Sequence, residues 1–194
     1  MATQQQRRDA TRGRLVEAAH AEFVRTGYDA TTTEAVLERA GVSRGALYHH
    51  FPTKQELFAA VFEQVSREAV ERAVARSRRH RSPLETLIGG CLAWLAVARE
   101  PAVAAILLDQ GPQVLGWVRA REIEGRYSLA LMKSGVEAAV DAGEIDVASV
   151  DLTAALLNAL VAETALSTLH AGGTLGPRVV AKSVRQFVGG LAAG

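Results

Sequence analysis

Apolar residues recur at helical spacing from the start of the chain. In residues 11–26 they lie four positions apart on one face of a helix, and Gly27 follows as a stop signal. The stretch TTTEAVLERAG, residues 31–41, predicts a second helix, which one of its three threonines caps and Gly41 ends. Both segments are therefore expected to be short amphipathic helices.

A third helix is predicted directly after this turn. Ser43 is a good N-cap for a helix that runs from Arg44 to His49, and Pro52 stops it. A helix, a glycine turn and a second helix make the helix-turn-helix pattern. The apolar residues in and around this pattern are expected to pack in the core: Ala40, Val42, Leu47 and Phe51.

The rest of the chain continues the helical pattern. A fourth helix begins near Lys54, with Thr53 as its cap, and is expected to continue up to Ser82 and Pro83. Five more helices are predicted, at residues 84–99, 102–110, 114–142, 150–170 and 178–191. The fold class is therefore all-α, with about nine helices. We expect an N-terminal three-helix helix-turn-helix domain at residues 1–54 and a C-terminal helical bundle at residues 55–194, bridged by the fourth helix.

Composition supports helices and adds a charge asymmetry. The 194 residues are 48% hydrophobic, enough for a real core, and helix formers dominate. The formal charge is +1, but residues 1–82 hold 14 Lys and Arg against 10 Asp and Glu, whereas residues 83–194 hold 8 against 11. The basic half is thus the candidate for binding nucleic acid, although solvated helix faces of mixed charge explain the balance equally well.

Cysteine usage and the N-terminus bear on location. Cys91 is the only cysteine, which excludes an intrachain disulfide and a cysteine-based zinc site. The first 14 residues lack the apolar segment of a signal peptide, and no apolar run is expected to reach the roughly 18 residues of a membrane span. We therefore expect a cytoplasmic protein without membrane contact.

One long stretch of the chain resembles a known family. Residues 31–58, TTTEAVLERAGVSRGALYHHFPTKQELF, place threonines at the start of the second helix, Ala-Gly-Val at the turn, Gly-x-Leu-Tyr-x-His-Phe on the third helix and a lysine at the start of the fourth. In these features the N-terminal part resembles the DNA-binding domain of TetR-family transcription regulators. The resemblance implies a homodimer, most often a repressor, that binds a palindromic operator in double-stranded DNA and is released by a small-molecule effector. It implies no cofactor.

The shape of a duplex supports the same interpretation, because its major groove admits one helix between two rows of phosphates. Arg44 is placed to donate two hydrogen bonds to a guanine edge, Gly45 lets the backbone approach, and Ala46 can meet a thymine methyl. Alternatively, Arg44 is merely solvated and one of the two histidines packs against the first helix. The candidate DNA-binding residues are Thr33, Ser43, Arg44, Gly45, Ala46, Tyr48, His49, His50 and Lys54.

The C-terminal half is expected to hold the effector. Residues 114–142 are apolar over more than one stripe, which predicts a helix buried among others, and the resemblance implies a pocket between such helices. Glu163, a single carboxylate in an apolar helix, can pair with an arginine, bind a cationic or hydrogen-bonding effector, or lie at a wet edge. The candidate lining residues, each of which can equally be core or surface, are Trp94, Ile106, Gln110, Trp117, Arg121, Tyr127 and Glu163.

The last two helices are candidates for the dimer interface. The helix at 178–191 carries one apolar stripe, and the helix at 150–170 is apolar on several faces. The resemblance implies that both pair with a second copy as a four-helix bundle; the alternative is that the stripe covers the core of one chain. The candidate interface residues are Leu156, Leu160, Val180, Val184, Phe187 and Leu191.

Two other classes of function compete with a DNA-binding regulator. The first is a helical-bundle enzyme that uses His49, His50 and Glu56 as acid–base groups. No nucleophile, phosphate loop or metal-spaced set accompanies these residues in the sequence, so neither a catalytic nor a metal site is expected. The second is an adaptor that binds an acidic partner protein through its basic half and does not bind DNA.

Overall fold

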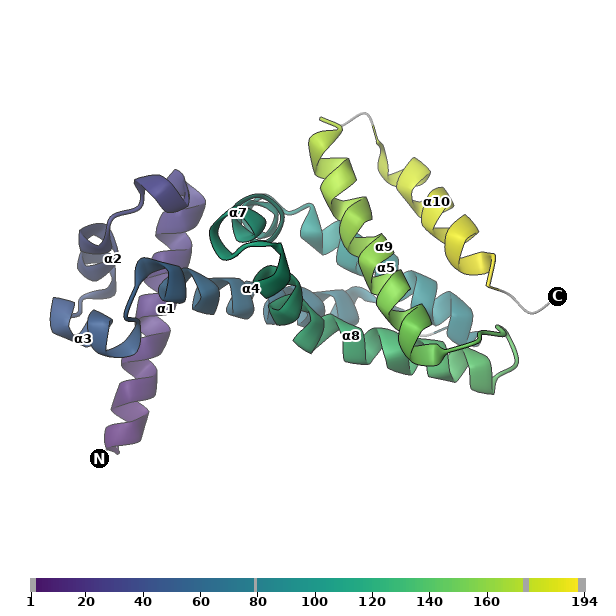
Figure 1. Cartoon of the computed structure of the whole chain (residues 1–194), viewed down its shortest axis with the longest axis horizontal. Helices are drawn as coiled ribbons and strands as arrows, with labels where there is room; N and C mark the ends of the chain where they lie inside the picture. Colours follow the sequence, from purple (N-terminus) through teal and green to yellow (C-terminus); the bar gives the residue numbers. More distant parts are fainter. Residues whose placement is uncertain (1–2, 79, 173–174, 192–194) are drawn as a thin grey trace.

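A computed structural model describes residues 3–78, 80–172 and 175–191, and it is helical in the way that the sequence predicts (Figure 1). Three helices form a smaller lobe: α1 (Gln4–Ala30), α2 (Thr33–Ala40) and α3 (Arg44–His50). From this lobe α4 (Lys54–Arg76) runs into a larger one, which also contains α5 (Pro83–Ala98), α6 (Pro101–Val103), η1 (Ala104–Gln110), α7 (Gly111–Leu115), α8 (Trp117–Asp141), α9 (Val150–His170) and α10 (Pro177–Gly189). Within the described ranges this makes nine helices when the continuous segment 101–115 is counted as one.

Side-chain caps fix the helices of the smaller lobe. Thr32, Ser43 and Thr53 each accept a hydrogen bond from the backbone N–H three residues ahead, at 3.2, 3.3 and 3.1 Å. Gly41 ends α2 in the left-handed conformation, which costs glycine little. These caps confirm the predicted starts of α2, α3 and α4. The sequence predicts them because each cap is encoded within a few residues.

Two predicted helix ends are wrong. The first helix begins at Gln4 instead of residue 11, because Thr3 and Gln6 form a reciprocal capping box at its start. The fourth ends at Arg76 and does not reach Ser82, because residues 77–81 supply no apolar side chain that would hold a further turn against the bundle. Gly27 does interrupt α1, with a φ of 81°.

The segment that follows α5 also differs from the prediction. Gly111 and Pro112 were expected to close a helix, yet the chain continues as a helix through them, with a π-helical stretch in η1. Gly111 instead allows close packing, since a Cβ there would lie 2.2 Å from Cε2 of Phe62. Pro112 lies in the first turn of α7, where it needs no N–H partner. The break falls at Gly116, whose φ is 77°, so α8 begins three residues later than expected.

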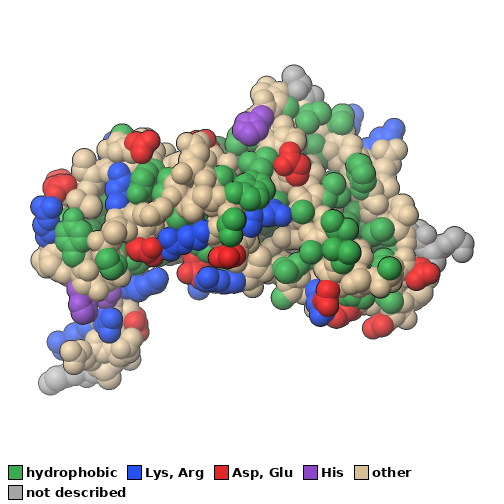
Figure 2. Space-filling view, viewed as in Figure 1, with side chains coloured by type: hydrophobic (Ala, Val, Ile, Leu, Met, Phe, Trp, Pro, Cys, Tyr) green, Lys and Arg blue, Asp and Glu red, His purple; other side chains and the backbone are tan. Residues whose placement is uncertain are grey.

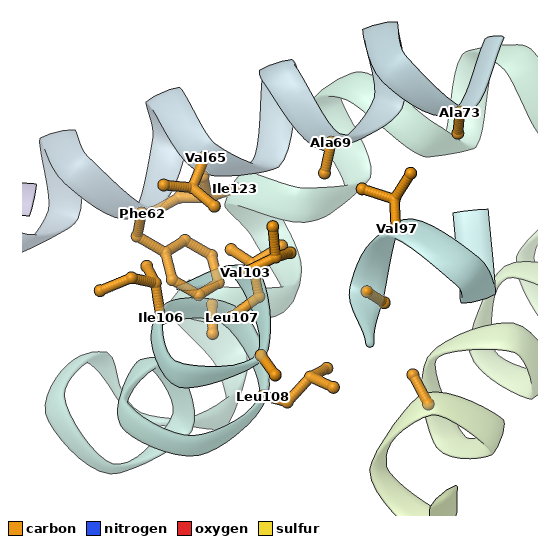
Figure 3. Close-up of a cluster of buried hydrophobic side chains, with 14 of the residues drawn as sticks. Phe62, Val65, Ala69, Ala73, Val97, Val103, Ile106, Leu107, Leu108 and Ile123 are labelled. Atoms are coloured by element: carbon orange, nitrogen blue, oxygen red, sulfur yellow. The ribbon is translucent and has the colours of Figure 1, made fainter. Parts of the chain in front are cut away.

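A continuous apolar core joins the two lobes through α4. Near its start, Phe58 packs against Phe23 and Tyr28 of α1, with ring centroids 5.2 and 5.4 Å away. Further along, Phe62 lies among buried side chains from η1 and α8 (Figure 3), of which the labelled ones include Ile106, Leu107 and Ile123. The two lobes are therefore packed together through the side chains of α4.

The apolar helix α9 corrects a further expectation. Its 21 residues include an 18-residue window of mean hydropathy 1.4, so it is long and apolar enough to cross a membrane by length and composition, and only 22% of that window is buried. The bent pair formed by α5 and residues 101–115 passes the same test together. In the structure α9 packs against α5, α8 and α10, as a bundle helix does.

Candidate nucleic-acid interface and internal cavity

The third helix, α3, presents a polar face to solvent. Arg44 has 66% of its side chain exposed, Tyr48 is 42% exposed and His49 is also exposed. On the opposite side Leu47 and Phe51 are buried, as the sequence predicts. The helix is thus anchored by its apolar side and leaves its polar side free to meet another molecule.

Arg44 makes only weak contacts within the chain. Its Nη1 lies 3.3 Å from Oε1 of Glu34, and its guanidinium lies 5.7 Å from the ring centroid of Tyr48. Both members of the ion pair are exposed, so solvent screens their attraction and the pair contributes little to stability. The guanidinium can therefore exchange Glu34 for another acceptor at little cost.

Several other candidates already have partners in the chain. Ser43 caps α3, and the Thr33 hydroxyl donates to the Glu34 carboxylate at 3.1 Å. The Lys54 ammonium donates to the backbone oxygen of Asp29 at 3.3 Å and lies 4.4 Å from the ring centroid of Tyr28. An ammonium has three donors, so Lys54 can bind an anion without giving up that bond.

The two small residues of α3 differ in exposure. Gly45 is exposed, and a Cβ built there would meet no atom within 4 Å. Packing within the chain therefore gives no reason for glycine at this position. Ala46 is half-buried, so only part of its methyl group faces outward.

The two histidines have different surroundings. His49 is exposed, whereas His50 is half-buried with its ring centroid 5.5 Å from that of His49. Burial lowers the pKa of His50, and the nearby His49, Arg8 and Arg12 lower it further. His50 is thus neutral near pH 7 and has one ring N–H to donate.

Sequence reasoning missed the basic start of α1. Arg7, Arg8, Arg12 and Arg14 are exposed there, and the Arg12 guanidinium lies 5.3 Å from the ring centroid of Phe51. Figure 2 shows Lys, Arg and His side chains gathered at the lower end of the smaller lobe, where α1 projects. The sequence signal for this basic start is the Thr3 cap ahead of Arg7 and Arg8.

The larger lobe contains a cavity of about 650 Å³ that is partly open to solvent. Residues of α4, α5, η1, α8 and α9 line it, and most are apolar. They include Val70, Leu87, Cys91, Trp94, Leu107, Leu131, Met132 and Val161. Cavities of this size and character hold small organic molecules in many proteins. Burial raises the pKa of the Cys91 thiol to about 11, so this side chain stays protonated and belongs to the apolar wall.

Of the predicted lining residues, only Trp94 faces this cavity. Ile106 is fully buried in the core of Figure 3. The Gln110 side-chain amide donates to the backbone oxygen of Phe23 at 3.2 Å and thereby joins η1 to α1. Both residues lie in the π-helical stretch, on parts of its surface that do not line the cavity.

The other candidates lie outside this cavity. Trp117 is 53% exposed, with the Arg121 guanidinium 5.4 Å from its ring centroid. The Tyr127 hydroxyl donates to the Glu63 carboxylate of α4 at 2.9 Å. Glu163 is exposed and accepts a hydrogen bond from its neighbour one turn on. Among the alternatives for Glu163, the wet edge is therefore the one that the structure shows.

Glu124 is the cavity residue that sequence reasoning missed. Its side chain lines the cavity, and its carboxylate accepts no hydrogen bond from any described residue. Burial raises its pKa to about 7, against a smaller lowering effect of Arg121. A signal existed, because Glu124 follows the buried Ala120 by one helical turn and so shares its inward face.

The candidate dimer residues divide into two groups. Leu156 and Phe187 are 61% and 66% exposed, and Leu160 and Leu191 are partly buried. Val180 and Val184 are instead buried against the chain's own bundle, which corrects their assignment. α10 packs on α5 and α9, and its stripe covers the core while Phe187 lies at the margin.

Three more large apolar residues extend the exposed surface. Leu152, Leu169 and Val179 are 61%, 41% and 53% exposed. Figure 2 shows hydrophobic side chains on the outer face of the larger lobe, where α9 and α10 lie. An apolar surface of this kind is typical of an interface with another protein.

Two family descriptions match the chain. Residues 15–61 match the bacterial regulatory proteins of the tetR family, and residues 84–191 match the tetracyclin repressor-like C-terminal domain. A crystal structure of a TetR-family transcriptional regulator from Pectobacterium atrosepticum is similar over 100% of this chain and 99% of that one, with a TM-score of 0.81 and 29% identity.

Curated relatives share shorter stretches. The transcriptional regulator CymR of Pseudomonas putida is 45% identical over 74 residues, which is 38% of this chain and 36% of that protein. The transcriptional repressor KstR2 of Mycobacterium tuberculosis is 32% identical over 123 residues, which is 61% of this chain and 60% of that protein. The chain thus spans about a third of the length of the first of these relatives and three fifths of the second.

Proposed function

Because this chain belongs to the TetR family of bacterial transcriptional regulators, a family of regulators and not of enzymes, we propose that it is a ligand-responsive repressor. As a homodimer it binds a palindromic operator through α3, and it leaves the operator when a small molecule enters the cavity. It acts in the cytoplasm, where the DNA is.

The observation that carries this proposal is the geometry of α3. The helix is capped by Ser43, anchored by the buried Leu47 and Phe51, and exposes Arg44 and Tyr48 on one side. A helix of this kind can enter the major groove with base-reading and phosphate-binding groups already in place. The basic start of α1 adds positive charge beside it, which favours a polyanion.

A dimer supplies the second recognition helix that a palindromic operator requires. Two recognition helices must lie about 34 to 36 Å apart, one turn of the duplex, to meet two half-sites together. The exposed apolar residues of α9 and α10, among them Leu156 and Phe187, provide a surface for the second copy. The domain division at residue 54 suits this arrangement, with α4 as the connection.

Release requires contact between the cavity and α3, and two routes exist. Ser66, Val70 and Ala73 of α4 line the cavity, so a ligand can displace α4 directly. Leu107 of η1 also lines it, and the same π-helical stretch ends in Gln110, which is bonded to α1. A difference of about 1 to 3 kcal/mol between the two states changes operator affinity by roughly 5- to 150-fold.

Selection from a pool of random duplexes tests the proposal. The purified chain is expected to enrich one palindrome with two half-sites about one helical turn apart. An adaptor that uses its basic half on an acidic protein would enrich no sequence, and such a result would remove the regulator from consideration. The helical-bundle enzyme has no support in the family.

A further inference from the structure

The cavity contains one carboxylate and no cation to match it. Glu124 lines the cavity, and no residue among those described along its wall is Lys or Arg. His80 is the one basic side chain of that wall, and it is exposed. Arg121 acts on Glu124 electrostatically but lies over Trp117, outside the cavity.

The hydroxyl groups of the wall do not serve Glu124 either. Ser66 donates to the backbone oxygen of Phe62 at 2.8 Å, and Ser128 donates to the backbone oxygen of Glu124, not to its carboxylate, at 3.0 Å. Thr86 donates to backbone oxygens near the start of α5. The hydroxyl protons of these three residues are thus occupied. Ser77 and Asn158 also line the cavity, and among the described residues no hydrogen bond joins either of them to the Glu124 carboxylate.

A carboxylate in such a place favours a particular ligand. An ionised group in apolar surroundings is costly unless a partner of opposite charge meets it. A ligand that supplies this charge gains a charge-assisted hydrogen bond and relieves that cost at once. Above about pH 7, where Glu124 is ionised, a ligand that carries a carboxylate would place two like charges together, and a neutral alcohol would supply only one ordinary hydrogen bond.

We propose that the effector is an organic cation, an apolar aromatic or aliphatic body with one protonated amine that binds Glu124. The apolar wall around Trp94, Leu107 and Met132 takes the body, and about 650 Å³ sets the upper limit of its size. This inference rests on the proposed function only in naming the ligand an effector; the binding itself concerns the cavity alone.

The two tryptophans make a direct assay possible. Trp94 lines the cavity, whereas Trp117 is outside it and exposed, so the Trp117→Phe variant leaves Trp94 as a single fluorescent reporter. In this background we would titrate two matched sets of probes: 4-phenylbutylamine, 4-phenylbutan-1-ol and 4-phenylbutanoate, and decylamine, decan-1-ol and decanoate. Each set keeps the body and changes only the polar group.

Three proteins are compared: the reporter background, Glu124→Gln in it, and Glu122→Gln in it as the control. Glu122 is an exposed carboxylate two residues away on the same helix and does not line the cavity. The amine is expected to bind the background roughly tenfold or more tightly than the alcohol and the acid of the same body. Glu124→Gln should reduce the affinity for the amine to that for the alcohol, and Glu122→Gln should leave all affinities unchanged.

Three results would overturn the proposal: an acid or alcohol that binds as tightly as its amine, an amine affinity that survives Glu124→Gln, or no binding by either amine. A thermal melt of each variant shows that it is folded. DNA binding is measured separately on the same samples. If the amine binds through Glu124 but no duplex is selected, the proposed function fails and the cation site stands. If a palindrome is selected but no amine binds through Glu124, the cation site fails and the proposed function stands.

Discussion

At the scale of single residues, the exposed side chains of α3 have different expected roles. Arg44 is held only by an exposed pair with Glu34 and by the ring of Tyr48, so it is free to reach a base edge. Lys54 lies beside Tyr28 at the start of α4, where an ammonium and the helix N-terminus both favour a phosphate. Base contacts specify a sequence, whereas phosphate contacts only position the protein.

Arg44→Ala is therefore expected to cost about 1 to 3 kcal/mol on the selected operator and little on random duplex. Lys54→Ala is the contrasting variant, which should weaken binding to all sequences alike and reduce the salt slope by about 1. Fluorescence anisotropy at several salt concentrations measures both effects. An equal loss on operator and random DNA for Arg44→Ala would assign this arginine to the phosphates instead.

Glu124 has a measurable effect on stability as well. Its pKa rises from an ordinary 4.5 to about 7 in the folded chain, so the folded chain holds the proton more tightly than the unfolded chain. Below about pH 4.5 Glu124 is protonated in both the folded and the unfolded chain, so its raised pKa does not reduce the free energy of unfolding. Between about pH 4.5 and 7 the unfolded chain ionises first, which destabilises the fold progressively, by about 3 kcal/mol at most.

Glu124→Gln is thus expected to be more stable than the wild type at about pH 8 and nearly equal to it at about pH 4.5. The free energy of unfolding in urea, measured across this range, checks the expectation. Glu122→Gln, which removes an exposed carboxylate, should show no such dependence. A constant difference at all pH values would mean that Glu124 is well solvated.

The sequence predicts the exposed face of α3 but not the wall of the cavity. The face of α3 was predictable because its caps and its apolar spacing are encoded within a few positions. The cavity wall was not, because each bundle helix is apolar on several sides and only tertiary packing decides which side faces the cavity. Glu163 was chosen because it interrupts an apolar helix, yet it is exposed, while Glu124 stands in a charged stretch and lines the cavity.

At the scale of elements, the segment from α6 to α7 connects the cavity with the smaller lobe. Its π-helical part places Leu107 at the cavity and Gln110 against α1, and Gly111 then packs against Phe62 of α4. The sequence suggested a stop at Gly111 and Pro112, since that pair usually ends helices. Only the neighbouring aromatic ring shows that the glycine is required for space.

Gly111→Ala should accordingly destabilise the chain by about 1 to 3 kcal/mol, because the added methyl overlaps the Phe62 ring. Gly13→Ala is the matched control: Gly13 is an exposed residue inside α1 with no neighbour within 4 Å of the added Cβ. This control should be neutral or more stable by about 0.5 to 1 kcal/mol. Urea denaturation compares the two. If Gly111→Ala is as stable as Gly13→Ala, the helix around Gly111 can move away from the Phe62 ring without loss of stability.

The outer faces of α9 and α10 make a further prediction at this scale. Leu156→Glu and Phe187→Glu place charges on the exposed apolar surface without disturbing the core, so each should yield folded monomers in sedimentation velocity. Val118→Glu on α8 changes an equally exposed valine outside this surface and should leave the dimer intact. If both of the first variants sediment as the wild type does, the second copy binds elsewhere.

At the scale of the whole molecule, α4 is the element that both functions share. It packs on α1 at one end and lines the cavity further along. The Glu56 carboxylate of α4 accepts two hydrogen bonds from Arg119 of α8, at 3.0 and 2.8 Å. A ligand between α4 and α8 would therefore act on the helix that packs against α1, and α1 in turn packs against α3. In a dimer, a small tilt of α4 changes the spacing of two reading helices.

The central claim is that two copies of α3 read one palindrome. The most direct measurement is a titration of the selected palindrome, and of a scrambled duplex of equal length, with the full chain at several salt concentrations. The account predicts two chains per palindrome and an affinity at least about a thousandfold higher than for the scrambled duplex. Equal affinity for the two duplexes, or saturation by a single chain, would contradict it.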